Sequence, residues 1–67
     1  MTPTQIKKLA EGIKFIADTT GELLKLSSEV AETSQEEALK ISEPLEEVSH
    51  GLVRLMDFAK NQSKLYA

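Results

Sequence analysis

Glu47 and His50 are the pair of side chains whose types and spacing could hold a metal ion. A Glu and a His three residues apart on one helix are the ligands that di-iron helical bundles present, and Glu22 or Glu43 could complete the set in a pair of associated hairpins. The helical phase places Glu47 and His50 on the polar outer side of their helix, whereas a metal ligand must face the bundle interior. We therefore expect no metal ligand and no cofactor. A ferritin-like metal-binding bundle using Glu47 and His50 remains as an alternative.

A run of carboxylates is the second feature with chemical potential. Residues 29–47 hold seven Glu against the single Lys40, a net charge of −6 within a chain of net charge −3. Such a run could occupy a basic site on a partner protein, so an acidic inhibitor is a further alternative. More often it is a solvated face that keeps a small protein soluble. Negative charge repels phosphate, and we expect no nucleic-acid binding.

Catalytic groups are missing from the pattern. The Ser and Thr residues fall at helix caps or on apolar rows, the single His has no orienting carboxylate in a triad, and no glycine-rich phosphate loop occurs. Acyl transfer and phosphoryl transfer need those groups. We expect no catalytic residues and a protein that is not an enzyme.

The length of the chain limits the size of the fold that could position a functional site. A chain of 67 residues and 7.4 kDa is close to the lower size for one hydrophobic core, and it has no cysteine for a disulfide or a thiolate site. We expect a single helical domain over residues 1–67, stabilised by oligomerisation. No apolar run approaches the roughly 20 residues that span a bilayer. We expect no membrane insertion, no signal peptide and a soluble cytoplasmic protein.

Apolar and small residues recur at alternating spacings of three and four, which predicts two long helices. The first series runs Ile6, Leu9, Ile13, Ile16, Thr20, Leu23, Ser27, Val30, and the second runs Ala38, Ile41, Leu45, Val48, Leu52, Leu55, Ala59. Period-2 alternation of β-branched residues, the pattern of strands, does not occur. We predict an all-α fold with helix one over about 3–32, a turn at about 33–34 and helix two over about 35–63.

Capping residues agree with these bounds. Thr2 precedes Pro3 and stands three residues before Gln5, and Ser34 stands in the same way before Glu37, so each helix begins with a predicted capping box.

Interruptions within the helices leave an alternative open. Thr19–Glu22 could divide helix one, and Ser42 could cap a new helix that has Pro44 in its first turn. The heptad phase continues across both points, which favours two continuous helices with a kink near Pro44. Glu36 and Lys40 have the spacing of an i, i+4 ion pair.

An antiparallel hairpin folded about Ser34 places residues whose numbers sum to 68 at the same height. The expected layers are Ile6/Gln62, Leu9/Ala59, Ile13/Leu55, Ile16/Leu52, Thr20/Val48, Leu23/Leu45, Ser27/Ile41 and Val30/Ala38. We also expect Gly12 to make room for Met56, and Gly51 to make room for Ala17, as close packing of facing helices requires.

Apolar residues remain on both flanks of this hairpin. We assign Phe15, Leu26, Leu39, Val53 and Met56 to one flank, and Ala10, Ala17, Leu24, Ala31 and Phe58 to the other. Two uncovered flanks indicate a partner, and a second copy of the hairpin would form a four-helix bundle. We therefore expect a non-enzymatic interaction protein, a small adaptor, assembly factor or regulator, that binds itself, a larger protein, or both. The expected partner-binding residues are Phe15, Leu26, Leu39, Val53, Met56 and Phe58.

Overall fold

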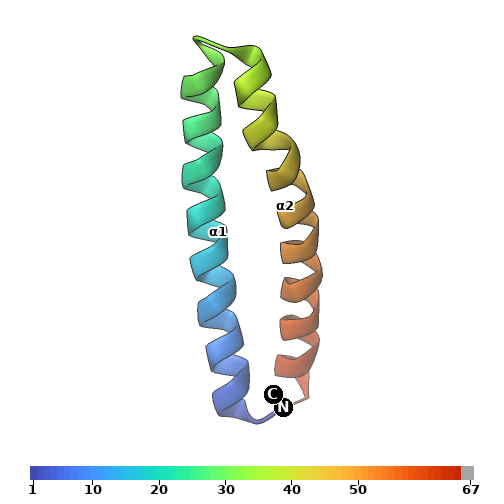
Figure 1. Ribbon diagram of the computed structural model, residues 1–67. Helices are drawn as coiled ribbons and strands as arrows, with labels where there is room; N and C mark the ends of the chain where they lie inside the picture. The colour runs from blue at the N-terminus through green and yellow to red at the C-terminus, as the bar shows by residue number, and fades with distance from the viewer. Residues whose placement is uncertain (66–67) are drawn as a thin grey trace.

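The computed structural model describes residues 1–65 and consists of two helices joined by a short turn. Helix α1 spans Pro3–Ala31 and helix α2 spans Gln35–Lys64. Figure 1 shows the helices side by side and antiparallel, with the start of α1 and the end of α2 at the same end of the molecule. The expected all-helical, two-helix hairpin is confirmed.

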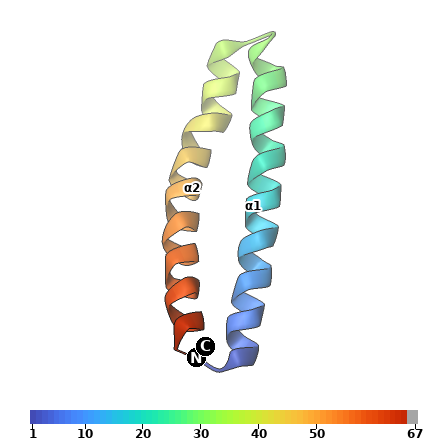
Figure 2. The same cartoon turned by 180° about the vertical axis from the view of Figure 1, so that it is seen from behind.

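The molecule is a rod. Its Cα atoms extend over 49 × 15 × 13 Å, so the molecule is more than three times as long as it is wide. The view from behind shows the same two helices with no third element across either face (Figure 2). In the part of the chain that the structure describes, both faces of the hairpin are therefore open to solvent along their whole length.

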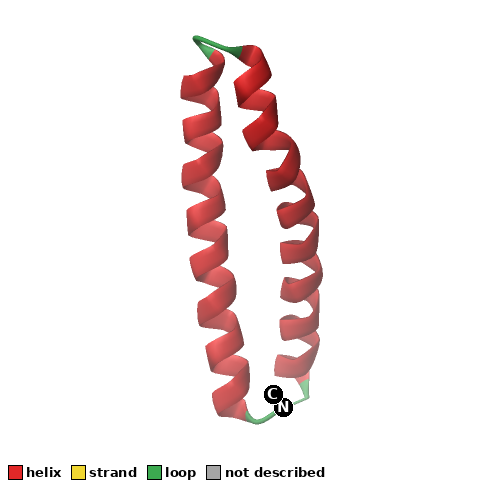
Figure 3. Cartoon of the chain, viewed as in Figure 1, coloured by secondary structure: helices red, strands yellow, loops and turns green. Residues whose placement is uncertain are grey.

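Both helices run without interruption. Helix α1 continues through Thr19–Glu22, and α2 continues through Ser42 and Pro44, so the three-helix alternative is wrong. Figure 3 shows one connecting loop between the two helical segments. Each helix is therefore one continuous element, and a residue's place on a helix face can be followed from end to end.

The cap of α1 is the predicted capping box. The Gln5 amide donates to the Thr2 hydroxyl at 3.1 Å, the Thr2 amide donates to the Gln5 side-chain oxygen at 2.9 Å, and Pro3 occupies the first turn. These bonds satisfy amides that have no partner within the helix. The start of α1 is thus fixed by the residues that predicted it.

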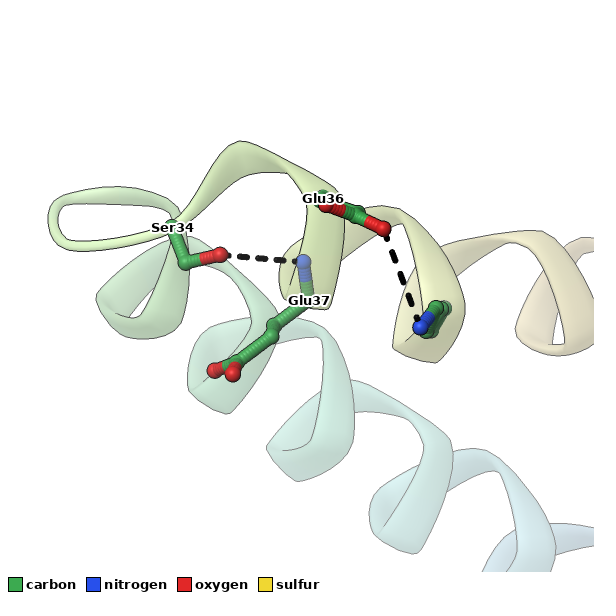
Figure 4. Close-up of polar contacts among 4 residues, drawn as sticks. Ser34, Glu36 and Glu37 are labelled. Atoms are coloured by element: carbon green, nitrogen blue, oxygen red, sulfur yellow. Dashed lines mark hydrogen bonds and ion pairs between the residues drawn. The ribbon is translucent and has the colours of Figure 1, made fainter.

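Only half of the capping box expected for α2 is formed. The Glu37 amide donates to the Ser34 hydroxyl at 3.2 Å (Figure 4), whereas the Ser34 amide donates to the Val30 carbonyl instead of to the Glu37 carboxylate. The predicted ion pair between Lys40 and Glu36 is present at 3.9 Å. Both of its side chains are largely exposed, so it stabilises α2 only slightly.

Backbone bonds close the turn between the helices. The Ser34 amide donates to the Val30 carbonyl at 2.8 Å, and the Thr33 amide and hydroxyl donate to the same carbonyl at 3.0 and 3.1 Å. The Glu32 amide donates to the Glu29 carbonyl at 3.2 Å. The last carbonyls of α1 thus find partners in a three-residue connection, which brings the chain back antiparallel.

Candidate interaction surface

One row of residues on each helix forms the contact between α1 and α2. Side chains seven residues apart lie almost in line along a helix. The closed row, as we call it, contains Ile6, Ile13, Thr20 and Ser27 of α1 and Ala38, Leu45, Leu52 and Ala59 of α2. All five residues that the hairpin buries, with 5–9% exposure, belong to the closed row: Ile13, Thr20, Ser27, Ala38 and Leu45.

A hydrogen bond within the closed row joins the two helices near the turn. The Ser27 hydroxyl donates to the Ala38 carbonyl at 3.0 Å, and both residues are buried. A hydroxyl can reach a backbone carbonyl of the facing helix only where that helix presents a small residue such as alanine. This bond fixes the register of α1 against α2 at the turn end.

The second row of the predicted seam remains half open, which corrects the expected core layers. This open row contains Leu9, Ile16, Leu23 and Val30 of α1 and Ile41, Val48, Leu55 and Gln62 of α2. Ile16, Leu23, Val48 and Leu55, at its centre, are 38–44% exposed. Each helix of a two-helix hairpin has one neighbouring helix. That neighbour covers the row nearest the contact line, and the next row stays exposed to solvent on its outer side.

Each row lies on one side of the hairpin for both helices. A half-turn about an axis perpendicular to the plane of the hairpin carries α1 onto α2 and reverses its direction, while the front of the hairpin stays the front. Equivalent rows of the two helices therefore share a side. We call the side with the open row the open face and the other side the opposite face.

The apolar flanks are consequently divided differently from the sequence-based grouping, which is wrong. Leu26 of α1 and Phe58 of α2 flank the open row on the same side, with Phe15 at its edge. Leu39, Val53 and Met56 lie on the opposite face, together with Leu24 and the small residues Ala10, Ala17 and Ala31. Residues of the two helices at the same height do not always share a side, because the reversal of helix direction brings equivalent rows of α1 and α2 to the same side.

All six expected partner-binding residues are exposed. Their exposure ranges from 45% for Leu26 to 72% for Phe15, and none lies between the two helices. The hairpin brings Phe15, Leu26 and Phe58 to the open face and the other three to the opposite face. Four further exposed apolar residues are ones that the heptad pattern places in the core: Ile16, Leu23, Val48 and Leu55. Half of the closed row is small or polar and the other half is Ile or Leu, so the residue types alone do not mark which row closes.

The three glycines do not make room for the facing helix. A Cβ atom placed at Gly12, Gly21 or Gly51 would meet nothing within 4 Å. The expected pairings of Gly12 with Met56 and of Gly51 with Ala17 are therefore wrong. Gly12 and Gly51 lie in the rows that flank the open row, outside the contact line, so the backbone there is bare on the outer side of the molecule.

The candidate metal ligands do not come together. Glu47 and His50 are both exposed on α2. Among residues 1–65, no three or more His, Cys, Asp or Glu side chains are grouped closely enough to hold a metal ion. The same residues enclose no pocket, and neither described helix has an apolar stretch able to cross a membrane.

The acidic segment surrounds the turn end of the rod. Its seven Glu residues lie at the end of α1, in the connecting turn and on the first half of α2, and all are exposed: Glu29, Glu32, Glu36, Glu37, Glu43, Glu46 and Glu47. The ends of the rod therefore differ in charge, while the apolar residues lie along its sides.

Comparison with protein-family models, with curated proteins and with solved structures finds no match to this chain.

Proposed function

We propose that this protein is a non-enzymatic interaction module, a small adaptor, assembly factor or regulator that acts through the apolar sides of its hairpin. One observation carries the proposal. The hairpin buries three hydrophobic residues, whereas thirteen large hydrophobic side chains are exposed among the residues described. Single exposed apolar side chains are ordinary, but rows of them along both sides of a rod mark a surface that another molecule covers.

Stability supports the same proposal. A small core contributes little against the conformational entropy of ordering a chain, which is about 1.5 kcal/mol per residue. Small domains without disulfides or metals commonly gain the missing stability by association. The partner in this proposal is a second copy of the chain, a larger protein, or both. A four-helix bundle and a kink in α2 near Pro44 are part of the proposal, as are a cytoplasmic location and the absence of nucleic-acid binding.

No observation singles out the alternatives. The metal-binding bundle needs Glu47 and His50 directed into a shared interior, and both are exposed on one helix. The acidic inhibitor rests on the charge of the turn end alone. Two observations support the interaction module, namely the extent of the exposed apolar sides and the small size of the core. We therefore prefer it to the two alternatives.

Two triple variants with a matched control test the proposal. One replaces Phe15, Leu26 and Phe58 by Ser on the open face, the second replaces Leu39, Val53 and Met56 by Ser on the opposite face, and the control replaces the exposed Glu11 and Asp57 by Ser. Sedimentation of the purified protein and quantitative affinity capture from the native host measure self-association and partner binding. Circular dichroism verifies that each variant remains helical.

We expect at least one triple variant to lose an association that the wild type and the control retain. Truncating a hot-spot residue of an interface costs about 2 kcal/mol or more, which is roughly a 30-fold rise in Kd. A wild type that associates with nothing, or two triple variants that keep every association of the wild type, would contradict the interaction module.

A further inference from the structure

We propose that the open face binds a second copy of itself, with the turns of the two hairpins at opposite ends of the resulting four-helix bundle. In this dimer α1 lies antiparallel to α1 of the second copy, and α2 antiparallel to α2. The inference rests on the proposed function and adds which face is homotypic, what covers it and in which orientation.

The exposed area of the hairpin matches what a stable dimer needs. The chain exposes 5299 Å². A compact monomer of 7.4 kDa is expected to expose about 4,200 Å². The excess of about 1,100 Å² exceeds the roughly 800 Å² per partner of a standard protein interface. One further hairpin is thus sufficient cover, and a much larger partner is not required.

The composition of the open face favours this side over the opposite face. Its flanking rows are Gln5, Gly12, Thr19 and Leu26 on α1, and Glu37, Pro44, Gly51, Phe58 and Leu65 on α2. Glu37, beside the turn, is the one charged residue in them. On the opposite face, Ser42 and Ser49 stand beside the closed row, and Lys7, Lys14 and Glu46 stand one row further out. Cores of interfaces are depleted in charged residues.

The open row supplies the contact itself. Ile16, Leu23, Val48 and Leu55 are the half-exposed side chains of the predicted seam, and a facing hairpin would complete their burial. The bare backbone at Gly12 and Gly51 lets a neighbouring helix approach closely, because no atom of the hairpin occupies the space in front of either glycine.

Charges at the outer rim of the open face select the orientation. The rim row of α1 is Lys8, Phe15, Glu22 and Glu29, and that of α2 is Lys40, Glu47, Arg54 and Asn61. With turns at opposite ends, Lys8 faces Glu29 of the second copy, and Glu47 faces Arg54 of the second copy. Each opposite-charge pair occurs twice by symmetry, and no like charges face each other along the rim.

Both pairs require the same two-fold axis. Lys8 and Glu29 are equidistant from a point between residues 18 and 19 of α1, and Glu47 and Arg54 from a point between residues 50 and 51 of α2. These points lie at the same height of the hairpin to within about one helical turn, or 5.4 Å. With turns at the same end, α1 would instead face α2 of the second copy. Glu29 would then face Lys40, but Glu22 would face Glu47, so a repulsive pair would offset each attractive one.

Single cysteines test the face and the orientation together, because the natural chain contains none. Thr19→Cys stands on the open face close to the proposed axis, next to the same residue of the second copy. Ala17→Cys, at almost the same height of α1, stands on the opposite face and is the matched control. Each full-length variant is purified, treated with an oxidant or a short thiol cross-linker, and examined by sedimentation and denaturing electrophoresis.

We expect the wild type to sediment at twice the monomer mass of 7.4 kDa at micromolar concentration. Thr19→Cys should become a covalent dimer, and Ala17→Cys should remain uncross-linked under the same treatment. A dimer that cross-links through Ala17→Cys, or through neither variant, overturns the proposed face or orientation while the interaction module stands. A wild type that stays monomeric yet binds another protein through its apolar sides overturns the homotypic dimer alone.

Discussion

Ser27 links the two helices through a single buried hydroxyl. Its bond to the Ala38 carbonyl is 3.0 Å long and lies near the turn, where α1 and α2 are closest in sequence. A hydroxyl on a buried row costs free energy unless it is hydrogen-bonded, so Ser27 is tolerated because Ala38 leaves the carbonyl accessible. The residue pair therefore specifies the register of the hairpin more than it adds to its stability.

Comparing Ser27→Ala with Ser28→Ala separates the contribution of this hydrogen bond to stability from the effect of helix propensity. Both variants gain the same propensity, because alanine is the best helix former. Ser28 is exposed, and its hydroxyl bonds the Leu24 carbonyl of its own helix at 3.3 Å. We expect the free energy of unfolding of Ser27→Ala to lie about 1 kcal/mol below that of Ser28→Ala. Urea denaturation measures the difference, and equal stabilities would show that the bond between the helices contributes nothing.

At the scale of the helices, most of the structure could be predicted from the sequence. Thr2 and Ser34 mark the two starts because a short polar side chain can accept a bond from a free amide, and the apolar spacing identifies the face that packs. The exposure of Leu23 and Val48 could not be predicted in the same way. A heptad pattern gives two apolar rows per helix, but which row closes depends on how two cylinders touch, and that is a property of the pair.

Pro44 and Pro3 make a matched comparison within these elements. Pro3 occupies the first turn of α1, where a missing amide costs nothing, whereas Pro44 lies inside α2 and removes a helical hydrogen bond. We expect Pro44→Ala to raise the free energy of unfolding by up to about 3 kcal/mol and to increase helicity. Pro3→Ala should leave both nearly unchanged. Circular dichroism and urea denaturation provide the measurements. A loss of stability in Pro44→Ala would instead mean that a bend at Pro44 is required for packing.

For the molecule as a whole, the arrangement of helices explains why the core is small. A rod of 49 × 15 × 13 Å has one line of contact, and the residues buried along it include Thr20 and Ser27, which contribute little apolar area. The larger side chains of the open row lie beside that line. A third or fourth helix would bury them. The side chains that leave a single hairpin only marginally stable are therefore the ones that would form the core of a bundle.

Leu23 and Leu24 allow the homotypic face to be tested with adjacent residues. They are 40% and 43% exposed in the hairpin, so they resemble each other in exposure, but they lie on the open and the opposite face respectively. If the open face binds a second copy, Leu23→Ser should weaken the dimer by about 2 kcal/mol or more, which is roughly a 30-fold rise in Kd. Leu24→Ser should leave the Kd within a small factor of the wild-type value.

Thermal unfolding as a function of protein concentration gives an independent measurement of the same pair. The Tm of a dimer rises with concentration because association stabilises the folded state by mass action. Wild type and Leu24→Ser should show this rise, and Leu23→Ser should lose it over the same range while remaining helical at low temperature. If the hairpin alone determined stability, the Tm of the wild type and of both variants would not depend on protein concentration. The two substitutions would then lower the Tm by similar amounts.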